Sequence, residues 1–476
     1  MAVNNLNKAK IPGTGTTAAR PSNPAVGDTY YNGTLGYQEI YTVNGWFPIG
    51  APASIPTSVV ATDQGSGRDY NNGQASVAFS VGTDAGATPS YVVTSSPGSY
   101  TATGTSSPIL VTGLQSSTQY TYTIVGKSPY GASNASAASA GVTATTVPQA
   151  PTIDSTVAAS NQARIFFTAN STGGSAITSF TATSSPGNFT ATGSSSPLTV
   201  TGLTNGTSYT FTVTATNANG TSLASSASSS TTPGPDVAPS TVELLVVAGG
   251  GGANTESTYQ SSGGGGGAGG YRYFANQSVA GSTNYTVTVG GGGASPSGKG
   301  SNSVFGSRSS TGGGGAGGPN YNAGNGGSGG GARSIENNRT PGSGNEGGYT
   351  PSEGNGGSAD GGGGGSGSGG SGSSGGSGTS NAITGTSVTR AKGGNGGSAN
   401  ENSPGAANTG DGGNGGARFG GTTAIGGSGV VILAYDSFGK KALTVGAGLT
   451  YTLDTSSRSG YNVYRFTAGT GTVSWA

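Results

Sequence analysis

The chain has 476 residues, 98 of them glycine, and only 7% of its residues are charged, with a formal net charge of +1. It contains no histidine and no cysteine, so disulfides, thiolate zinc sites, cysteine nucleophiles and the commonest general base are excluded. The 17 acidic residues form no pair suited to carboxylate catalysis and the basic residues form no cluster, so we expect a non-enzymatic protein with no cofactor, no metal site and no nucleic-acid partner.

The N-terminal residues lack the basic and apolar regions of a signal peptide, and no stretch approaches the ~20 apolar residues that cross a bilayer. We therefore expect no membrane insertion. A chain that looks extracellular but carries no export signal can leave its host inside a virion released at lysis. The sequence thus favours synthesis in the host cytoplasm and a final place on a virion surface.

Residues 1–53 predict a small β-meander. Three aromatic runs within residues 27–50 are separated by Asn-Gly pairs, which favour tight hairpin turns. A sheet this small is not stable by itself, so we expect it to fold against a partner or another subunit. The runs resemble the short aromatic units of phage tail-fibre and other virion proteins. The resemblance implies docking on other virion structural proteins; the alternative is an ordinary module that caps the next domain. The implied docking residues are Tyr30, Tyr31, Tyr41, Trp46 and Phe47.

An internal repeat follows. Short motifs recur 89 positions apart, as at Ser95 and Ser184 or at Tyr120 and Tyr209, and a repeat of this length is a whole domain. The unit is rich in Thr, Val, Ser and Tyr, in alternating runs bounded by Gly, Pro and Asn, which is typical of a β-sandwich. The alternation places one set of side chains inward: Tyr120, Tyr122, Ile124, Tyr209, Phe211 and Val213.

The repeat resembles the fibronectin type III family in its bacterial and phage form. The tyrosine that follows each Gly-Leu pair looks like a tyrosine corner, whose hydroxyl bonds back to the preceding turn. The match covers residues 54–147 and 148–235. The usual core tryptophan is absent, and Phe79 and either Phe166 or Phe167 are its expected substitutes. Such modules act as spacers or as binding scaffolds, and the fold alone does not decide between these roles.

Residues 241–435 are dominated by glycine. Apolar strands at residues 241–248 and 430–435 bracket the region and a third, at 285–289, interrupts it. A flexible tether would not need these strands. A collagen-like triple helix is not supported, because the sequence has no three-residue period. Calcium-binding repeats are not supported either, because the regularly spaced aspartates they need are missing. What remains is a bundle of extended glycine helices with three residues per turn, close-packed and bonded through the backbone.

This arrangement resembles the glycine-rich domains of phage tail fibres and adhesins, in which loops between glycine strands form a tip that touches the host. The resemblance implies a host cell-surface receptor, either a glycan or an outer-membrane protein. The interrupting segments at residues 319–321, 333–349, 381–392 and 401–404 are then the candidate contact loops. Exposed aromatics and arginines commonly anchor binding surfaces, so the candidate contacts are Tyr321, Arg339, Tyr349 and Arg390.

Residues 436–476 hold three further alternating runs and predict a small C-terminal β-cap. The predicted fold is therefore all-β and multidomain: a meander, two fibronectin type III-like sandwiches, a polyglycine II-like bundle with flanking strands, and the cap. The expected function is that of a structural fibre and adhesion protein of a phage virion. The alternatives are a capsid or tail decoration protein with no receptor and, third, a bacterial surface adhesin. We expect a homo-oligomer, with a trimer favoured because the small meander would gain from threefold association.

Overall fold

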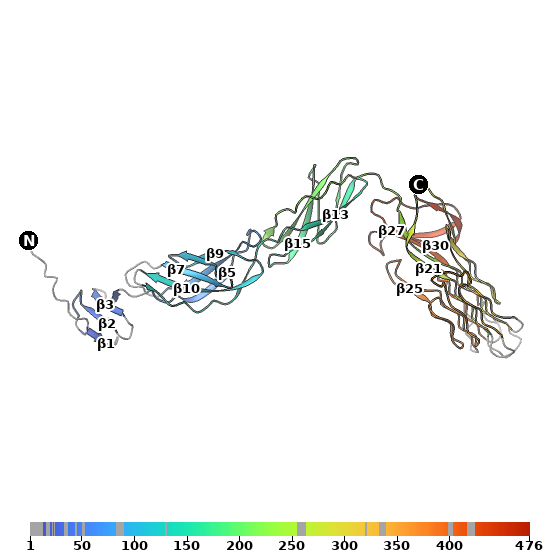
Figure 1. The fold of residues 1–476 in the computed structure, drawn as a ribbon, viewed down its shortest axis with the longest axis horizontal. Helices are drawn as coiled ribbons and strands as arrows, with labels where there is room; N and C mark the ends of the chain where they lie inside the picture. The colour runs from blue at the N-terminus through green and yellow to red at the C-terminus, as the bar shows by residue number, and fades with distance from the viewer. Residues whose placement is uncertain are drawn as a thin grey trace, which may run out of the picture. The chain divides into compact units, whose positions relative to one another are not determined.

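The computed structural model describes residues 13–15, 20, 22, 24–32, 37–42, 45–49, 53–81, 90–128, 131–254, 263–318, 321–332, 339–397, 403–416 and 424–476. Within these ranges every regular element is a β-strand, which confirms the predicted all-β multidomain fold (Figure 1). The chain divides into two compact units, Met1–Gly234 and Pro235–Ala476.

The first unit begins with a four-stranded sheet in the order β1-β2-β3-β4. Its strands are β1 (Gly13–Gly15), β2 (Thr29–Asn32), β3 (Tyr37–Thr42) and β4 (Gly45–Ile49). Strands β2 to β4 form an antiparallel meander. Strand β1 adds a parallel edge strand, which the polar N-terminal sequence did not predict. Inside the sheet the Glu39 carboxylate is buried and accepts hydrogen bonds from Arg20 at 2.8 Å and from Asn32 at 3.1 Å. A buried charged pair therefore helps to hold this small sheet together.

Two β-sandwiches follow and repeat one arrangement. The first pairs a sheet β5-β6-β9 with a sheet β11-β10-β7-β8, in which β12 also pairs with β10; the second pairs β13-β14-β17 with β16-β15-β18-β19. The strands of the first are β5 (Thr57–Asp63), β6 (Gly73–Ser80), β7 (Ser90–Ser96), β8 (Thr101–Gly104), β9 (Ile109–Leu114), β10 (Thr118–Ser128), β11 (Gly131–Ala132) and β12 (Val142–Ala144). Those of the second are β13 (Thr152–Ala159), β14 (Gln162–Thr168), β15 (Ile177–Ser185), β16 (Thr190–Gly193), β17 (Leu198–Thr201), β18 (Thr210–Asn217) and β19 (Gly220–Thr221).

The sandwich cores lie on the predicted faces of the chain. The six residues predicted to point inward are all buried: Tyr120, Tyr122, Ile124, Tyr209, Phe211 and Val213. The Tyr120 hydroxyl accepts a hydrogen bond from the Gln115 amide at 3.0 Å, and the Tyr209 hydroxyl accepts one from the Thr204 amide at 3.1 Å. Both bonds confirm the predicted tyrosine corner.

Phenylalanine takes the core position of the missing tryptophan. Phe79 is buried against Tyr91 with ring centroids 4.9 Å apart, and Phe167 is buried against Phe180 at the same separation. Phe166 is only half-buried. Of the two candidates in the second repeat, Phe167 is therefore the substitute.

A row of serines closes one edge of each sandwich, a feature that the sequence analysis did not identify. In the second sandwich, serines three residues apart run beside β18; Ser225 donates its amide to the Val213 carbonyl at 2.9 Å, and its hydroxyl accepts the Val213 amide at 3.0 Å. The same pair of hydrogen bonds recurs along both rows. The serines that make it are Ser133, Ser136, Ser139, Ser222, Ser225 and Ser228. The hydroxyls thus satisfy the backbone of a strand edge that could otherwise pair with another chain.

A nine-stranded sheet organises the second unit. Its main path is β21-β20-β27-β30-β22-β23-β24, and β28 and β29 also pair with β30. The strands are β20 (Thr241–Val247), β21 (Tyr271–Ser278), β22 (Tyr285–Thr288), β23 (Ser303–Phe305), β24 (Arg308–Ser310), β27 (Val430–Asp436), β28 (Thr444–Val445), β29 (Leu449–Asp454) and β30 (Tyr461–Ser474). Because β30 pairs with both β27 and β22, the segment expected as a separate C-terminal cap belongs to the same sheet as the strands around the glycine-rich region.

The two central strands of this sheet are buried on both faces. On one face Leu244 and Val246 of β20 join an aromatic-rich core that includes Trp475. On the other face Leu245 and Val247 pack under a hairpin formed by β25 (Thr379–Asn381) and β26 (Val388–Arg390). Burial on both faces explains the continuous apolar runs that begin and end the glycine-rich region.

Extended glycine segments run out from this sheet and back to it (Figure 1). Residues 249–254 show how they are bonded: successive amides donate to three different neighbouring segments, and the neighbour repeats at every third residue. The amide-to-carbonyl bonds run from Gly249 to Ser301, Gly250 to Gly427, Gly251 to Gly267, Gly252 to Gly298, Ala253 to Ala424 and Asn254 to Gly264. A three-residue repeat is that of an extended glycine helix, so this region is the predicted polyglycine II-like bundle.

Close packing makes glycine necessary in this array. A Cβ atom on Gly250 would lie 2.0 Å from the carbonyl oxygen of Asp411, and one on Gly251 would lie 2.1 Å from that of Gly314. The carbonyls of residues 249–251 also accept amides from Gly313, Gly293 and Gly413, so backbone from other segments surrounds this one. Any side chain there would displace main chain rather than a movable side chain.

Candidate functional site

The glycine array has two ends with different surroundings. At one end its segments continue into the strands of the nine-stranded sheet, as residues 249–254 follow β20. The opposite end, which we call the far end, is marked by Asn254, Gly263, Gly318, Tyr321 and Gly397. These residues contact one another: the Asn254 side-chain amide donates to the Gly317 carbonyl at 3.1 Å, Gly397 bridges to Gly263, and Gly318 bridges to Tyr321.

Array segments from several parts of the chain meet at the far end. The described residues on either side of residues 255–262, 319–320, 333–338, 398–402 and 417–423 all belong to array segments that are bonded to each other. Ala253 donates to Ala424 at 2.9 Å, Gly331 to Gly265 at 2.9 Å, and Gly415 to Asn395 at 2.8 Å. The array therefore brings together residues that are far apart in sequence, at the end away from the sheet.

Two of the predicted contact residues lie at or beside the far end. The Tyr321 side chain is 37% exposed, and its hydroxyl bonds to the Ser297 hydroxyl at 2.9 Å and accepts a bond from the Asn254 amide at 3.4 Å. Arg339 is half-buried and precedes Thr340, whose carbonyl accepts the Ala323 amide at 3.2 Å. The structure thus brings Tyr321 and Arg339 into one region. Residues 319–320, 333–338 and 401–402 of the predicted contact segments lie outside the described residues.

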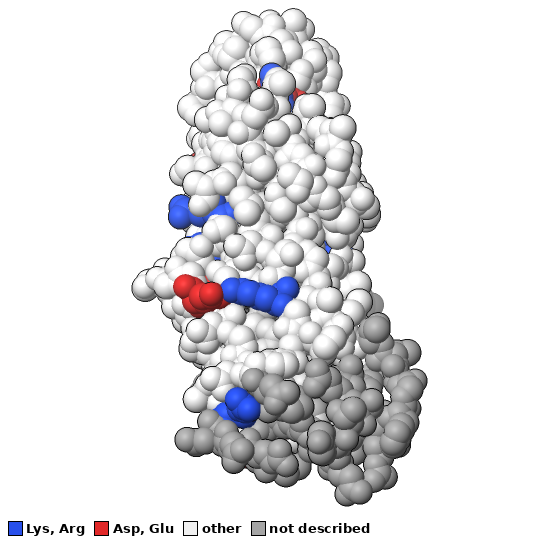
Figure 2. Space-filling model, turned by 90° about the vertical axis from the view of Figure 1, so that its right-hand side faces the viewer, with Lys and Arg blue, Asp and Glu red and all other residues white. Residues whose placement is uncertain are grey.

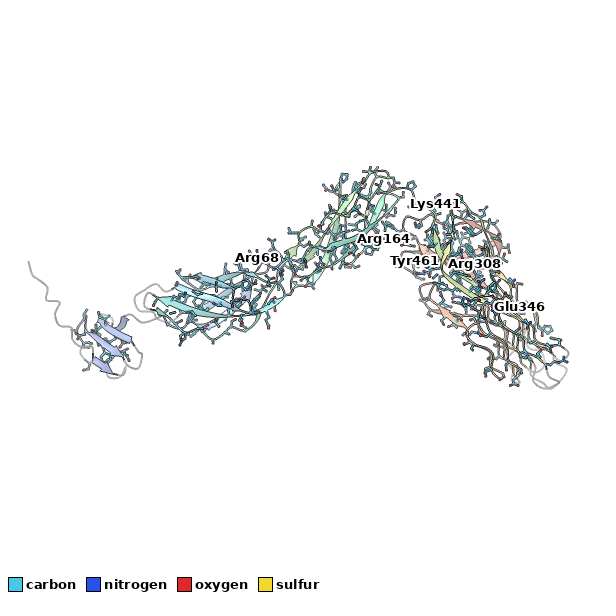
Figure 3. The ribbon with its side chains drawn as sticks, viewed as in Figure 1. Arg68, Arg164, Arg308, Glu346, Lys441 and Tyr461 are labelled. Atoms are coloured by element: carbon cyan, nitrogen blue, oxygen red, sulfur yellow. The ribbon has the colours of Figure 1, made fainter. Side chains whose placement is uncertain are left out.

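The other two predicted contacts lie at the sheet end. Tyr349 is half-buried, its ring stacks under the Arg272 guanidinium of β21 at 3.8 Å, and its hydroxyl bonds to Ser309 at 2.7 Å. Arg308, labelled in Figure 3, stacks on the ring of neighbouring Phe274 at 4.8 Å. Tyr349 therefore belongs to a packed cation–π cluster on the sheet rather than to the far end.

The structure contradicts the expected exposure of Arg390. The sequence predicted an exposed contact, but Arg390 is 2% exposed, in the β25–β26 hairpin that covers the second face of the sheet. Burial lowers the pKa of its guanidinium, and the charge of Arg465 lowers it further. Its neighbour Tyr271 has its pKa raised to about 12, mainly by burial. Residues 381–392, predicted as one of the contact loops between glycine strands, include this hairpin, which packs on the sheet.

The predicted docking residues of the N-terminal sheet form one aromatic cluster where their side chains are described. Trp46 lies 5.9 Å from Tyr30 and 5.5 Å from Tyr41, measured between ring centroids. Tyr30 is 3% exposed and is therefore core, whereas Tyr41 and Trp46 are half-buried. The side chains of Tyr31 and Phe47 lie outside the described residues. Docking by this sheet stays a prediction.

A groove of about 600 Å³ lies along the flank of the array. The sequence predicted no groove there, although Lys392 and Pro404 of its lining belong to the predicted contact segments 381–392 and 401–404. It is lined by glycine backbone and by polar side chains, chiefly Lys392, Asn395, Asp411 and Asn414, with Pro404 at one end. Burial raises the pKa of Asp411. A signal was present in the sequence: Asp411 and Asn414, like Lys392 and Asn395, are three residues apart, which is the repeat of the array.

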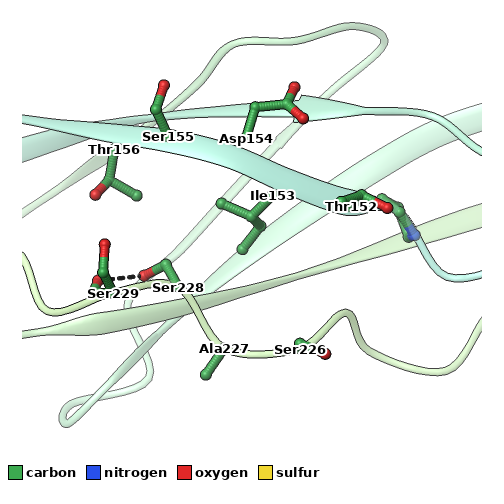
Figure 4. A pocket seen from close by; sticks show the side chains of 10 residues that line it. Thr152, Ile153, Asp154, Ser155, Thr156, Ser226, Ala227, Ser228 and Ser229 are labelled. Carbon is green, nitrogen blue, oxygen red and sulfur yellow. Dashed lines mark hydrogen bonds between the residues drawn. The ribbon is translucent and has the colours of Figure 1, made fainter.

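Two other hollows are smaller. One of about 210 Å³ lies in the second sandwich, between β13 and residues 226–229 (Figure 4). Ile153 points into it and Asp154 points away, so no charged side chain reaches inside. Another, of about 240 Å³, borders Glu243 and Tyr461 beside the sheet. Both are below the ~300 Å³ at which ligand pockets usually begin.

Charged groups are sparse on the surface. Figure 2 shows few Lys, Arg, Asp and Glu side chains on one face of the molecule, among them an acidic group directly beside a basic one. Among the described residues no group of three or more His, Cys, Asp or Glu side chains could hold a metal ion. Within the same residues no helix has the length and apolarity of a membrane span.

Comparison with known proteins identifies two domain types. Residues 147–232 match the family model described as Fibronectin type III domain, and residues 224–436 match the one described as Glycine-rich domain. The chain carries both domains. No curated protein matches it. Among solved structures, the FN1–FN3 domains of chicken CNTN1 are 15% identical over 42% of this chain and 77% of that one, with a TM-score of 0.23, which is too low to support an argument.

These two domain types suggest an extracellular or adhesion-type β protein. The fibronectin type III match covers the second sandwich, and the first sandwich repeats its strand order, its tyrosine corner and its serine row. The glycine-rich match ends at residue 436, whereas the sheet of the second unit continues through β30.

Proposed function

We propose that this chain is a non-enzymatic fibre and adhesion protein of a bacteriophage virion. Its N-terminal sheet docks on other virion structural proteins, its sandwiches act as spacers, and the far end of the glycine array contacts a receptor on the host surface. The chain works as a homo-oligomer, with a trimer favoured. The resemblance of its aromatic N-terminal runs and glycine-rich segments to those of phage fibres supports the virion assignment.

The observation that carries the proposal is the gathering, at the far end, of array residues that are far apart in the sequence. Each array segment is fixed by backbone bonds to several neighbours, so the described residues at the far end are held on a rigid scaffold. Turns on a rigid scaffold can vary in sequence while the scaffold holds them in place, and binding residues are concentrated on such segments. This is what a receptor-binding surface requires. The absence of histidine and cysteine from the whole sequence supports a role without catalysis.

Location and binding together test this proposal. Gold-labelled antibodies against the chain should mark the fibres of purified phage particles, and the purified full-length chain should compete with phage for adsorption to host cells. Label spread over the head without competition would instead identify a decoration protein. Label on bacteria that carry no phage would identify a bacterial surface adhesin.

A matched pair of variants tests the far end itself. Tyr321→Ala should weaken competition about tenfold or more, because Tyr321 is an exposed aromatic among the described residues of that end and such residues dominate interfaces. Leu223→Ala removes a side chain that is 76% exposed on the second sandwich and should leave competition unchanged. Equal competition by both variants would contradict the placement of the contact surface.

A further inference from the structure

The groove along the flank of the array, which we call the flank groove, is lined entirely by residues that the structure describes. It runs from the β25–β26 hairpin, where Ser380 and Thr389 line it, past Lys392 and Asn395 toward Pro404. Its volume of about 600 Å³ falls within the ~300–1,000 Å³ range of ligand sites. The groove is therefore large enough to hold part of an extended molecule.

Backbone bonds fix the polar side chains of the groove. The Asn395 side-chain oxygen accepts the Gly375 amide at 2.8 Å, and the Asn414 side-chain oxygen accepts the Asn395 amide at 2.8 Å. Asp411 accepts the Lys392 amide through Oδ1 at 2.9 Å. The side chains of Asn395, Asp411 and Asn414 are thus each held by a main-chain amide. Their orientation is set before any ligand arrives, so binding would cost little side-chain entropy.

The same bonds determine what the groove offers to a ligand. With Oδ1 engaged, the Nδ2 group of Asn395 remains as a donor. The Asp411 carboxylate, which also bonds to Thr409, keeps acceptor capacity, and the Lys392 ammonium is exposed beside them. The hydroxyls of Ser380 and Thr389 bond to each other at 2.7 Å, so both can still accept and one of them can still donate. The groove thus presents both donors and acceptors, and its side chains include no aromatic or large aliphatic group.

This chemistry discriminates among ligand classes. An apolar ligand would leave the polar groups unpaired, and a multiply charged anion would meet the Asp411 carboxylate. A row of sugar hydroxyls matches it, because each hydroxyl both donates and accepts. We propose that the flank groove binds a segment of a hydroxyl-rich, uncharged saccharide chain. This inference rests on the proposed adhesion function, for which it names the receptor class.

The test uses the full-length chain and an array of defined, uncharged bacterial surface oligosaccharides, followed by titration of the strongest ligand. Asn395→Asp keeps the Oδ1 bond to the Gly375 amide and exchanges the donor for a second carboxylate, so affinity should fall about tenfold. Asn325→Asp is the matched control: Asn325 accepts the Ser343 amide in the same way at 2.8 Å but does not line the groove, so affinity should stay unchanged.

Lys392→Gln gives a second reading, because Lys392 holds the array through its main chain and its exposed side chain can be replaced without loss of those bonds. It should lower affinity several-fold. The groove assignment is overturned if no oligosaccharide binds, or if both groove variants bind as well as wild type. Adsorption competition separates the two proposals: competition without saccharide binding rejects the groove alone, and groove-dependent saccharide binding without competition rejects the adhesion function.

Discussion

Gly251→Ala should unfold the second unit far more easily than its single added methyl group suggests. The new Cβ would lie 2.1 Å from the Gly314 carbonyl oxygen, and Cβ atoms essentially never approach a neighbour within 3.0 Å, so main chain must move by about 0.9 Å. That oxygen accepts the Gly267 amide at 2.8 Å, and the Gly314 amide donates to Ser328 at 2.9 Å. Each weakened buried bond costs about 1–3 kcal/mol, so we expect a loss of about 3 kcal/mol or more.

Tryptophan fluorescence can follow this unit alone. The chain has two tryptophans, Trp46 and Trp475, and Trp475 is buried in the core of the nine-stranded sheet. In a Trp46→Phe background, urea unfolding monitored through Trp475 should show the midpoint lowered by about 1 M, for a slope of ~3 kcal/mol/M. Gly291→Ala is the control, because a Cβ there meets nothing within 4 Å; it should change stability by less than ~1 kcal/mol. Equal midpoints for both variants would refute the close packing of the array.

Three further predictions concern other parts of the chain. Ser225→Ala removes the hydroxyl that accepts a buried β18 amide, so calorimetry should show the first unit destabilised by about 1–3 kcal/mol. The control Ser226→Ala changes an exposed neighbour and should cost less than ~0.5 kcal/mol of stability. Similar losses of stability in both variants would contradict the role of the serine row. Burial raises the pKa of Asp411, so its contribution to stability is complete below the ordinary aspartate pKa and is lost as pH rises through the raised value. The melting temperature of Asp411→Asn relative to wild type should therefore increase from pH 3.5 to pH 7, and a constant difference would exclude this linkage. Arg390→Met should leave both stability and adsorption competition unchanged or raise stability slightly, since a buried guanidinium is replaced by an apolar chain; weakened competition with an intact fold would restore Arg390 as a contact.

Periodicity carried the fold prediction well. Alternation of period two identified the buried faces of the sandwiches, and the 89-residue repeat identified two copies of one domain, because both patterns follow directly from side-chain direction in a strand. The serine rows escaped notice since their spacing of three is neither the strand nor the helix period. It becomes meaningful only when the segment is seen beside β18, with each hydroxyl on a backbone amide.

The contact residues were harder to place because the sequence does not state at which end of the array a turn lies. Tyr321 and Arg390 both interrupt glycine runs, yet the first lies at the far end and the second packs on the sheet. Following the direction of successive segments from β20 onward would have separated these turns, since each reversal alternates between the two ends. Residue type alone could not do so: a buried Arg390 and an exposed one look the same in sequence.

The repeat of three in the backbone bonds also sets how the array can change its length. Every segment bonds through identical main-chain groups, so adding three residues to an outgoing segment and three to each of its partners restores the whole pattern one turn further out, about 9 Å away. Insertions in other numbers would rotate the bonding directions away from their partners. The length of the array can therefore change in steps of three residues per segment, which would move a binding end outward while the anchoring sheet stays the same.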